Sequence, residues 1–298
     1  MCPRFFSRLC VTIKPMISKG EEQYVRQAAY LPEHVLPLMT GLSGAEPFIR
    51  SDHLLFVAPG SMIFIGYPLT GEFQEEIFNV VLKDARGEFR PASTWLIAPR
   101  IPEGLSGEVR GRETDEYYRL DLQGLNIKGR LHREVEKARL NVRVEMEHAW
   151  TPEHADLTRD FLAGEELSAR MREHYLRMES LLRHSETSAL LSARDSKGNL
   201  AAYFVAEGWA QKFLTYVTGC YSRRPYTAHA SDVLFDEMIR MAGEQGKQHI
   251  QLGLGVNEGI RRFKRKWGGA PSLRYESGEI SSGPGKFFSW LEMLQKRL

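Results

Sequence analysis

Apolar and polar positions divide the C-terminal half of the chain into a regular series of elements. Short apolar runs bounded by turn residues are typical of strands, whereas apolar residues repeating every three or four positions are typical of helices. The pattern predicts strands over 188–193, 200–206 and 212–221, a helix over 231–242, a strand over 250–254, a helix over 257–267, a strand over 273–276 and a helix over 287–298. A polar turn, Asp195-Ser196-Lys197-Gly198-Asn199, separates the first two strands, so the first three should form an antiparallel meander.

The N-terminal half follows a similar pattern with less regularity. It predicts a helix over 21–30, a hairpin of strands over 53–57 and 62–67, a helix over 73–85, a strand over 94–98, a helix over 127–140, a strand over 142–146 and helical segments from 152 to 184 with a break near Gly164. Gly87 is expected to end the helix over 73–85. The apolar stripe of that helix is Phe73, Ile77, Val80, Val81 and Ala85.

Basic residues are concentrated in the helix over 127–140. They are Lys128, Arg130, Arg133, Lys137 and Arg139. Glu134 and Glu136 lie among them at ion-pair spacing. A solvated helix face is the simpler interpretation, and a phosphate site is the alternative.

The length of 298 residues favours two compact units over one. We expect an N-terminal arm over 1–47, a first unit over 48–150 and a second unit over 151–298, with the boundary near Trp150. If the second unit folds by itself, limited proteolysis should leave a stable fragment that begins near this residue.

Composition narrows the classes of protein that fit. Hydrophobic content of 42% and charged content of 26% are typical of a globular protein. A net charge of +2 is too small for a surface that coats nucleic acid, so no DNA partner is expected and any anionic partner must bind at a local site. No stretch approaches the roughly 20 apolar residues of a membrane span.

Cysteine and histidine positions limit the chemistry further. Cys2, Cys10 and Cys220 have no CxxC spacing, which indicates a reducing compartment, and we expect a cytoplasmic protein. Cys220 lacks an identifiable orienting partner and is interpreted as a buried structural residue. The histidines form no HExxH motif, so no metal site is expected.

Two adjacent segments near the C-terminus share a motif with a known family. Leu252-Gly253-Leu254-Gly255 ends a predicted strand, and Ile260-Arg261-Arg262-Phe263-Lys264-Arg265-Lys266-Trp267-Gly268-Gly269 follows it. With the order of the elements, these segments resemble the Gly-then-FKxxxG part of FemAB-like and CelD/BcsL-like acyltransferases, a branch of the GNAT superfamily. The resemblance covers residues 187–275, and the N-terminal half resembles the first unit of that branch only loosely. It implies an α/β (α+β) fold of tandem GNAT-like units, each a mixed, mostly antiparallel sheet flanked by helices.

The resemblance also implies an activity. An enzyme of this kind moves an acyl or aminoacyl group from an activated donor, here acetyl-CoA or another acyl-CoA, to an amine or hydroxyl of a small molecule or a cell-envelope precursor. Transfer from aminoacyl-tRNA is the alternative within this chemistry. A catalytically inactive GNAT-like binding module is the alternative from another class, and the oligomeric state is left open.

The expected donor site departs from the superfamily pattern. Acetyl-CoA enzymes place an R/Q-x-x-G-x-G/A loop before the central helix, whereas residues 221–230 contain no glycine. A phosphate could still bind at the helix N-terminus, with Arg223 and Arg224 as a clamp, although these arginines could equally decorate a loop. The residues expected at the donor are Tyr221, Ser222, Arg223, Arg224, Ser231 and Asn257.

Two basic residues of the last motif are candidate site residues. Lys264 occupies the position of the superfamily's tyrosine, which implies a catalytic role, and Lys266 is expected to bind substrate. Residues two apart on a helix point in different directions, so only one lysine should matter strongly. The simpler interpretation is a solvated basic face.

The meander supplies two further catalytic candidates. Glu207 ends the second strand and could accept a proton from the acceptor, although an exposed strand-end glutamate is the simpler interpretation. Tyr216 or Tyr221 could orient the acyl carbonyl, although strand tyrosines more often pack in a core. Because Tyr216 and Tyr221 have opposite parity on their strand, at most one should face a given pocket.

Overall fold

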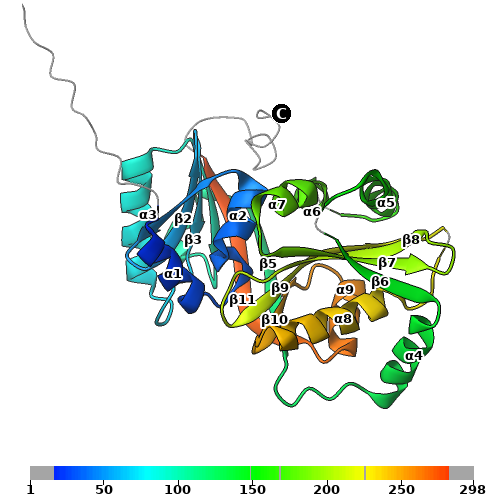
Figure 1. The fold of residues 1–298 in the computed structure, drawn as a ribbon. Helices are drawn as coiled ribbons and strands as arrows, with labels where there is room; N and C mark the ends of the chain where they lie inside the picture. Colours follow the sequence, from blue (N-terminus) through cyan, green and yellow to red (C-terminus); the bar gives the residue numbers. More distant parts are fainter. Residues whose placement is uncertain (1–16, 148, 168, 225, 282–298) are drawn as a thin grey trace, which may run out of the picture.

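The computed structural model describes residues 17–147, 149–167, 169–224 and 226–281 (Figure 1). The predicted helix over 287–298 lies outside these residues, as do Cys2 and Cys10. Strands of the described residues are β1 (Glu46–Arg50), β2 (His53–Ala58), β3 (Ser61–Ile65), β4 (Ser93–Ala98), β5 (Val109–Asp121), β6 (Val142–Glu147), β7 (Ser188–Asp195), β8 (Leu200–Glu207), β9 (Phe213–Tyr221), β10 (His249–Leu254) and β11 (Ala270–Ser281). They form one continuous sheet in the order β1-β2-β3-β4-β11-β5-β10-β9-β8-β7-β6.

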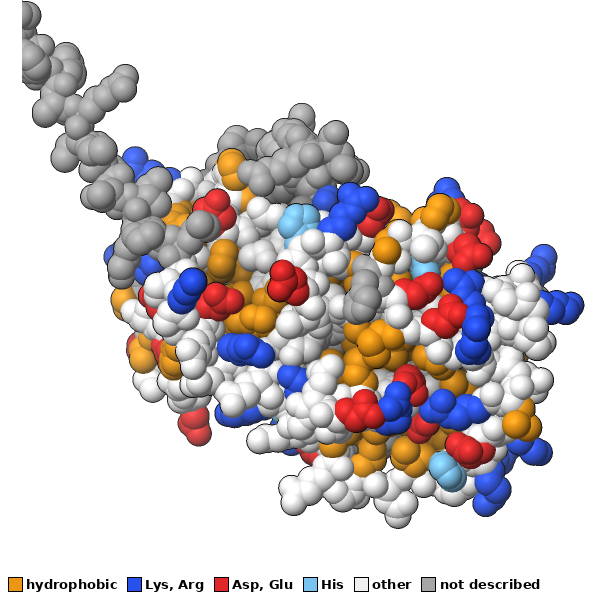
Figure 2. Space-filling model, viewed as in Figure 1, with side chains coloured by type: hydrophobic (Ala, Val, Ile, Leu, Met, Phe, Trp, Pro, Cys, Tyr) orange, Lys and Arg blue, Asp and Glu red, His pale blue; other side chains and the backbone are white. Residues whose placement is uncertain are grey.

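Helices cover both faces of this sheet. One face carries α1 (Lys19–Ala28), α2 (Leu36–Ser43), α5 (Pro152–Ala163), α6 (Ala169–Leu176) and α7 (Met178–His184), whose buried side chains share one core cluster. The opposite face carries α3 (Glu75–Phe89), α4 (Gly129–Arg139), α8 (Ala230–Glu244) and α9 (Glu258–Lys266), which pack in two further clusters. In Figure 2, charged side chains of both signs are interspersed over the visible face, in keeping with the small net charge.

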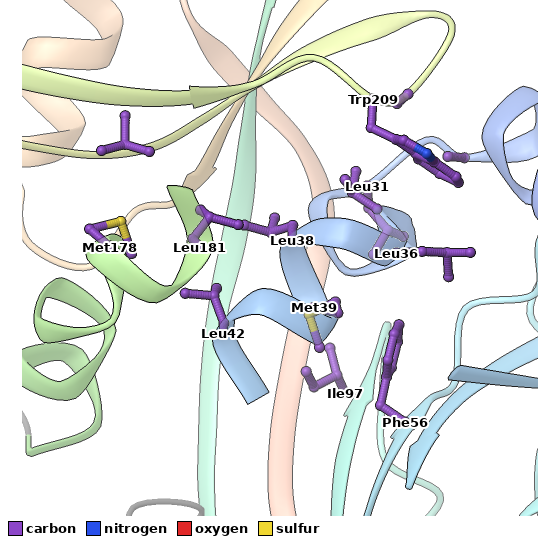
Figure 3. Close-up of a cluster of buried hydrophobic side chains, with 14 of the residues drawn as sticks. Leu31, Leu36, Leu38, Met39, Leu42, Phe56, Ile97, Met178, Leu181 and Trp209 are labelled. Carbon is purple, nitrogen blue, oxygen red and sulfur yellow. The ribbon is translucent and has the colours of Figure 1, made fainter. Parts of the chain in front are cut away.

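The segment expected as an N-terminal arm packs into the core from α1 onward. Val25 of α1 is fully buried, and Leu38, Met39 and Leu42 of α2 join the same cluster as Ile97 of β4 (Figure 3). The boundary expected at residue 47 falls inside β1. Where one unit ends and the next begins stays a prediction.

The two halves of the chain exchange strands at the centre of the sheet. β11, from the C-terminal half, pairs with β4 and β5 of the N-terminal half. β5 in turn pairs with β10, with Leu120 opposite Ile250. Figure 1 shows β5 and β11 running side by side between the two halves. The sheet is therefore completed by strands from both halves.

The apolar stripe expected for α3 is confirmed at Val81 and Ala85 and is wrong at Ile77 and Val80. Phe78, Val81, Leu82 and Ala85 face the core. Ile77 and Val80, by contrast, are 41% and 58% exposed. The helix also continues through Gly87 to Phe89. Phe73 lies before the first residue of α3, so a helical period counted from Phe73 does not follow the buried face of the helix.

Candidate functional site

The sheet opens between the parallel strands β9 and β10. These strands pair over His249–Gln251 and Phe213–Thr215, and their remaining residues diverge. Gly253 has φ +68°, and the register of β10 against β5 shifts between Gln251 and Gly253. A left-handed residue at this point turns the end of β10 away from β9. Gly253 is therefore the residue at which β10 parts from β9.

A cavity of about 570 Å³ occupies this opening and reaches both faces of the sheet. Its lining includes Met39 of α2 and Tyr175 of α6 on one face. On the other face it includes Ser231 of α8 and Phe263 of α9. A concave, largely apolar volume of this size is typical of a small-molecule site. We define this volume as the central cavity.

Lys264 supplies an amine to the wall of the central cavity. Its side chain is 3% exposed, and its Nζ donates a hydrogen bond to the carbonyl oxygen of Leu254 at the open end of β10. Nζ also lies 5.5 Å from the ring centroid of Tyr118. Burial lowers the pKa of Lys264 to about 7, against the opposing charge of Asp115. At neutral pH the amine therefore exists in both protonation states.

The turn between β10 and α9 positions Lys264. Asn257 caps α9, because its side-chain oxygen accepts from the Ile260 N–H at 2.9 Å. Val256, just before it, has φ 54°, an uncommon conformation for a β-branched residue. The Asp115 carboxylate accepts from the Val256 N–H at 2.8 Å and holds this turn. Asn257 and Lys264 both line the central cavity as a result.

Tyr216 and Tyr221 both line the central cavity, so the expectation from their parity is wrong. Val205 pairs with Thr218, but Ala206 pairs with Tyr216, so β9 carries one extra residue here. This bulge reverses the alternation of the strand. Burial raises the pKa of the Tyr216 hydroxyl well above its ordinary value, so the group stays protonated and can donate a hydrogen bond.

Glu207 lies outside the lining of the central cavity and is fully buried, so the expectation of an exposed strand-end carboxylate is wrong. Its oxygens accept hydrogen bonds from the hydroxyls of Ser185, Thr187 and Ser188, and from the Trp209 N–H at 2.9 Å. These contacts tie the ends of β7 and β8 together. A catalytic role for Glu207 stays a prediction that this placement does not favour.

Arg223, one of the two arginines expected to bind an anion, contacts other residues of the protein. Arg223 pairs with Glu165 and donates to the Gly164 carbonyl at 2.8 Å. Arg224 is exposed, and neither arginine lines the central cavity. The Ser222 N–H donates to the Ala201 carbonyl at 2.7 Å, so this residue extends the β8–β9 pairing.

A buried carboxylate, Asp232, lies in the first turn of α8. It accepts from both His229 Nδ1 at 2.9 Å and Trp267 Nε1 at 3.2 Å. Lys266 Nζ donates to its two oxygens at 2.6 and 2.7 Å. Lys266 therefore points away from Lys264, as the helix geometry predicted. The helix dipole favours a negative charge at the start of α8, and the carboxylate of Asp232 supplies that charge.

Several residues of the central cavity were missed at the level of sequence. Glu33 and Glu113 line it from the N-terminal half. Tyr117 lines the same cavity, and its pKa is raised by burial and then by the charge of Glu33. These residues lie far from the C-terminal motif in the chain, and no local pattern marks them. Cys220 also lines the cavity, and burial raises the pKa of its thiol to about 12, in line with a structural residue.

Comparison with known proteins identifies the fold. No family model and no curated protein matches the chain. The solved structure of L-PGS from Bacillus licheniformis is similar with a TM-score of 0.54 and 14% identity, over 95% of this chain and 98% of that one. A tandem GNAT protein from the clavulanic acid biosynthesis pathway is similar with a TM-score of 0.54 and 12% identity, over 91% of this chain and 98% of that one. The chain has a tandem GNAT-like fold.

FemX gives a further match to this GNAT-like fold, with a TM-score of 0.55 and 12% identity over 86% of this chain and 94% of that one. At identities this low, the similarity concerns the fold alone. It confirms the expected fold class. Membership of the FemAB-like branch stays a prediction.

None of the helices among the described residues of this GNAT-like chain is long and apolar enough to cross a membrane. In the same ranges, no three His, Cys, Asp or Glu side chains gather as a metal-binding group.

Proposed function

We propose that this protein is an acyltransferase whose reaction takes place in the central cavity. The observation that carries the proposal is Lys264, a buried amine with a pKa of about 7 on the wall of a cavity that passes between two parted strands. A general base works best when its pKa is close to the operating pH. Lys264 meets this condition because of burial.

The chemistry assigned to Lys264 is proton transfer. The acceptor's amine or hydroxyl attacks the acyl carbon, a new amide or ester bond forms, and the bond to the donor's sulfur or oxygen breaks. Neutral Lys264 takes the proton from the attacking group and returns it to the leaving group. Tyr216, which stays protonated, donates a hydrogen bond to the acyl carbonyl as negative charge develops there.

An acyl-CoA is the proposed donor, and an amine or hydroxyl on a small molecule or cell-envelope precursor is the proposed acceptor. The structures matched include FemX, an L-PGS, and the C-terminal domain of a putative lysylphosphatidylglycerol synthetase from Agrobacterium fabrum. These similarities support an aminoacyl ester, such as aminoacyl-tRNA, as the second candidate donor. Both donors present a carbonyl carbon with a leaving group and fit the same use of Lys264.

Replacement of Lys264 tests the proposal. A panel of acyl-CoA and aminoacyl donors is first assayed with wild-type protein for transfer to amine and hydroxyl acceptors. With any productive pair, Lys264→Met should lower kcat about 100-fold or more, since general-base catalysis is lost. Lys264→Arg should fail likewise, because arginine has no neutral form at neutral pH. The wild-type rate should fall as the pH drops through about 7.

The control is Lys83→Met, which removes an exposed lysine of α3. It should transfer at the wild-type rate. Equal rates for Lys264→Met and the wild type would refute the role of the amine.

A non-catalytic binding module is the second candidate function. Asp232 favours it, because its carboxylate fills the start of α8 where an anionic donor would otherwise be stabilised. Saturable donor binding without transfer to any acceptor would support this candidate over an enzyme.

A further inference from the structure

A second cavity, of about 400 Å³, lies between the start of α4 and the outer side of α9. We define it as the basic cavity. Its cationic side chains are Lys128, Arg130, Arg262, Arg265 and Lys266. Two carboxylates, Glu134 and Glu258, also line it, so its walls carry three more positive than negative groups. The cations come from two elements far apart in the sequence and converge on one volume.

Two of these cations have no counter-ion among the described residues. Arg130 pairs with Glu134 at 2.9 Å, and Arg265 lies 3.6 Å from Glu258. Lys266 is held by Asp232. Across the ranges that the structure describes, neither Lys128 nor Arg262 makes an ion pair. An anion entering the basic cavity would therefore meet these two charges first.

The two elements are close enough to act on one ligand. The pKa of Glu134, on α4, is lowered first by its hydrogen bond from Arg130 and then by the charges of His229 and Lys266. Lys266 is on α9, so the charges of the two helices already act on each other. Figure 1 shows α4, α8 and α9 together on one side of the sheet.

Arg262 connects the basic cavity to the central cavity, because it lines both. On α9, residues 258, 262 and 266 follow each other at four-residue spacing and face the basic cavity. Ile260, Phe263 and Lys264 face the central cavity. A ligand lying across Arg262 would have its charged part on α4 and α9 and its other end beside Lys264.

We infer that the basic cavity holds the phosphate groups of the donor, with Lys128 and Arg262 as the principal ligands. The inference rests on the proposed function, and it assigns the donor's phosphates to residues of α4 and α9 in place of Arg223 and Arg224. The planar guanidinium of Arg262 can donate two parallel hydrogen bonds to phosphate oxygens, and Lys128 adds a compact charge. The α4 helix thereby becomes part of the binding site.

Inorganic pyrophosphate is the first probe, measured by isothermal titration calorimetry on the full chain. The double variant Lys128→Gln, Arg262→Gln should raise the Kd about tenfold or more, since charge-assisted contacts are lost. It should also weaken the dependence of Kd on salt. The matched variant Arg223→Gln, Arg224→Gln removes the same charge at the other candidate place and should bind like the wild type. A loss confined to the Arg223 and Arg224 variant would overturn the inference, as would equal binding by all three proteins.

Coenzyme A is the second probe and tests whether the phosphates belong to the donor. CoA should displace pyrophosphate from the wild type, and its affinity should fall in the Lys128 and Arg262 variant. Failure of CoA to displace pyrophosphate overturns the assignment to a CoA donor. Because both measurements are of binding, they remain decisive even if transfer is never observed and the proposed function fails.

Discussion

Lys264 shows how one buried side chain links stability to pH. A lysine amine that leaves water loses the solvation of its charge, so its neutral form is favoured. Its pKa therefore falls from an ordinary 10.5 to about 7. Between these two values the unfolded chain binds a proton that the folded chain does not. The folded state therefore gains stability as the pH rises through this window.

This linkage predicts the behaviour of Lys264→Met. Without the ionisable amine, the free energy of unfolding should no longer rise between about pH 7 and 10. At pH 7 the variant should therefore be free of a pH-linked cost of about 4 kcal/mol. Denaturant titrations of both proteins across this window measure the difference. Parallel curves for the two proteins would contradict the burial of a shifted amine.

Among the elements, agreement between sequence and structure follows the strength of the apolar pattern. The strands of the meander are buried on both faces and stand out as apolar runs, whereas α8 has one buried face that repeats with the helical period. β5 was missed, because most of its side chains are exposed and its buried residues, Tyr117, Tyr118 and Leu120, are confined to its C-terminal end. A strand of this kind exists through its pairing with β11, which local sequence does not reveal.

The candidate site was predictable only where its residues belong to one local motif. Asn257 and Lys264 lie within a single motif and reach the central cavity together. The bulge of β9 could not be expected, since it depends on how β8 and β9 pair. Glu33 and Glu113 reach the cavity by tertiary packing alone.

The β9 strand allows a direct test of close packing beside the site. A Cβ added at Gly219 would lie 2.4 Å from the Phe204 ring and 2.6 Å from the Tyr216 hydroxyl. Gly219→Ala should therefore displace Tyr216 and lower the free energy of unfolding by about 1–3 kcal/mol. Gly243→Ala, in α8, meets no atom within 4 Å and should stabilise the protein by about 0.5–1 kcal/mol. Thermal and denaturant unfolding measure both variants, and equal effects would contradict the predicted contacts.

At the scale of the whole molecule, the exchange of β5 and β11 alters what proteolysis should show. A fragment over 151–298 would lack β5, which lies between β10 and β11 in the sheet. In that fragment, β10 and β11 would each expose the backbone groups that pair with β5. The sheet therefore argues against the stable C-terminal fragment that the sequence led us to expect.

Separate expression of the two halves tests this consequence. Residues 151–298 alone should show no cooperative unfolding by circular dichroism, and mixing with residues 1–150 should restore it. Full cooperative unfolding of the C-terminal fragment by itself would show that the exchanged strand is dispensable.

The exchange also sets an order of events during synthesis. β4 and β5 leave the ribosome long before β11, yet β11 must lie between them. Until residue 281 has emerged, the edges of β4 and β5 that pair with β11 have no partner strand. Such edges pair readily with other chains, and domains otherwise tend to fold from the N-terminus as they appear. The last strand to be made is thus the one that closes the molecule, so a truncated translation product would remain open at its centre.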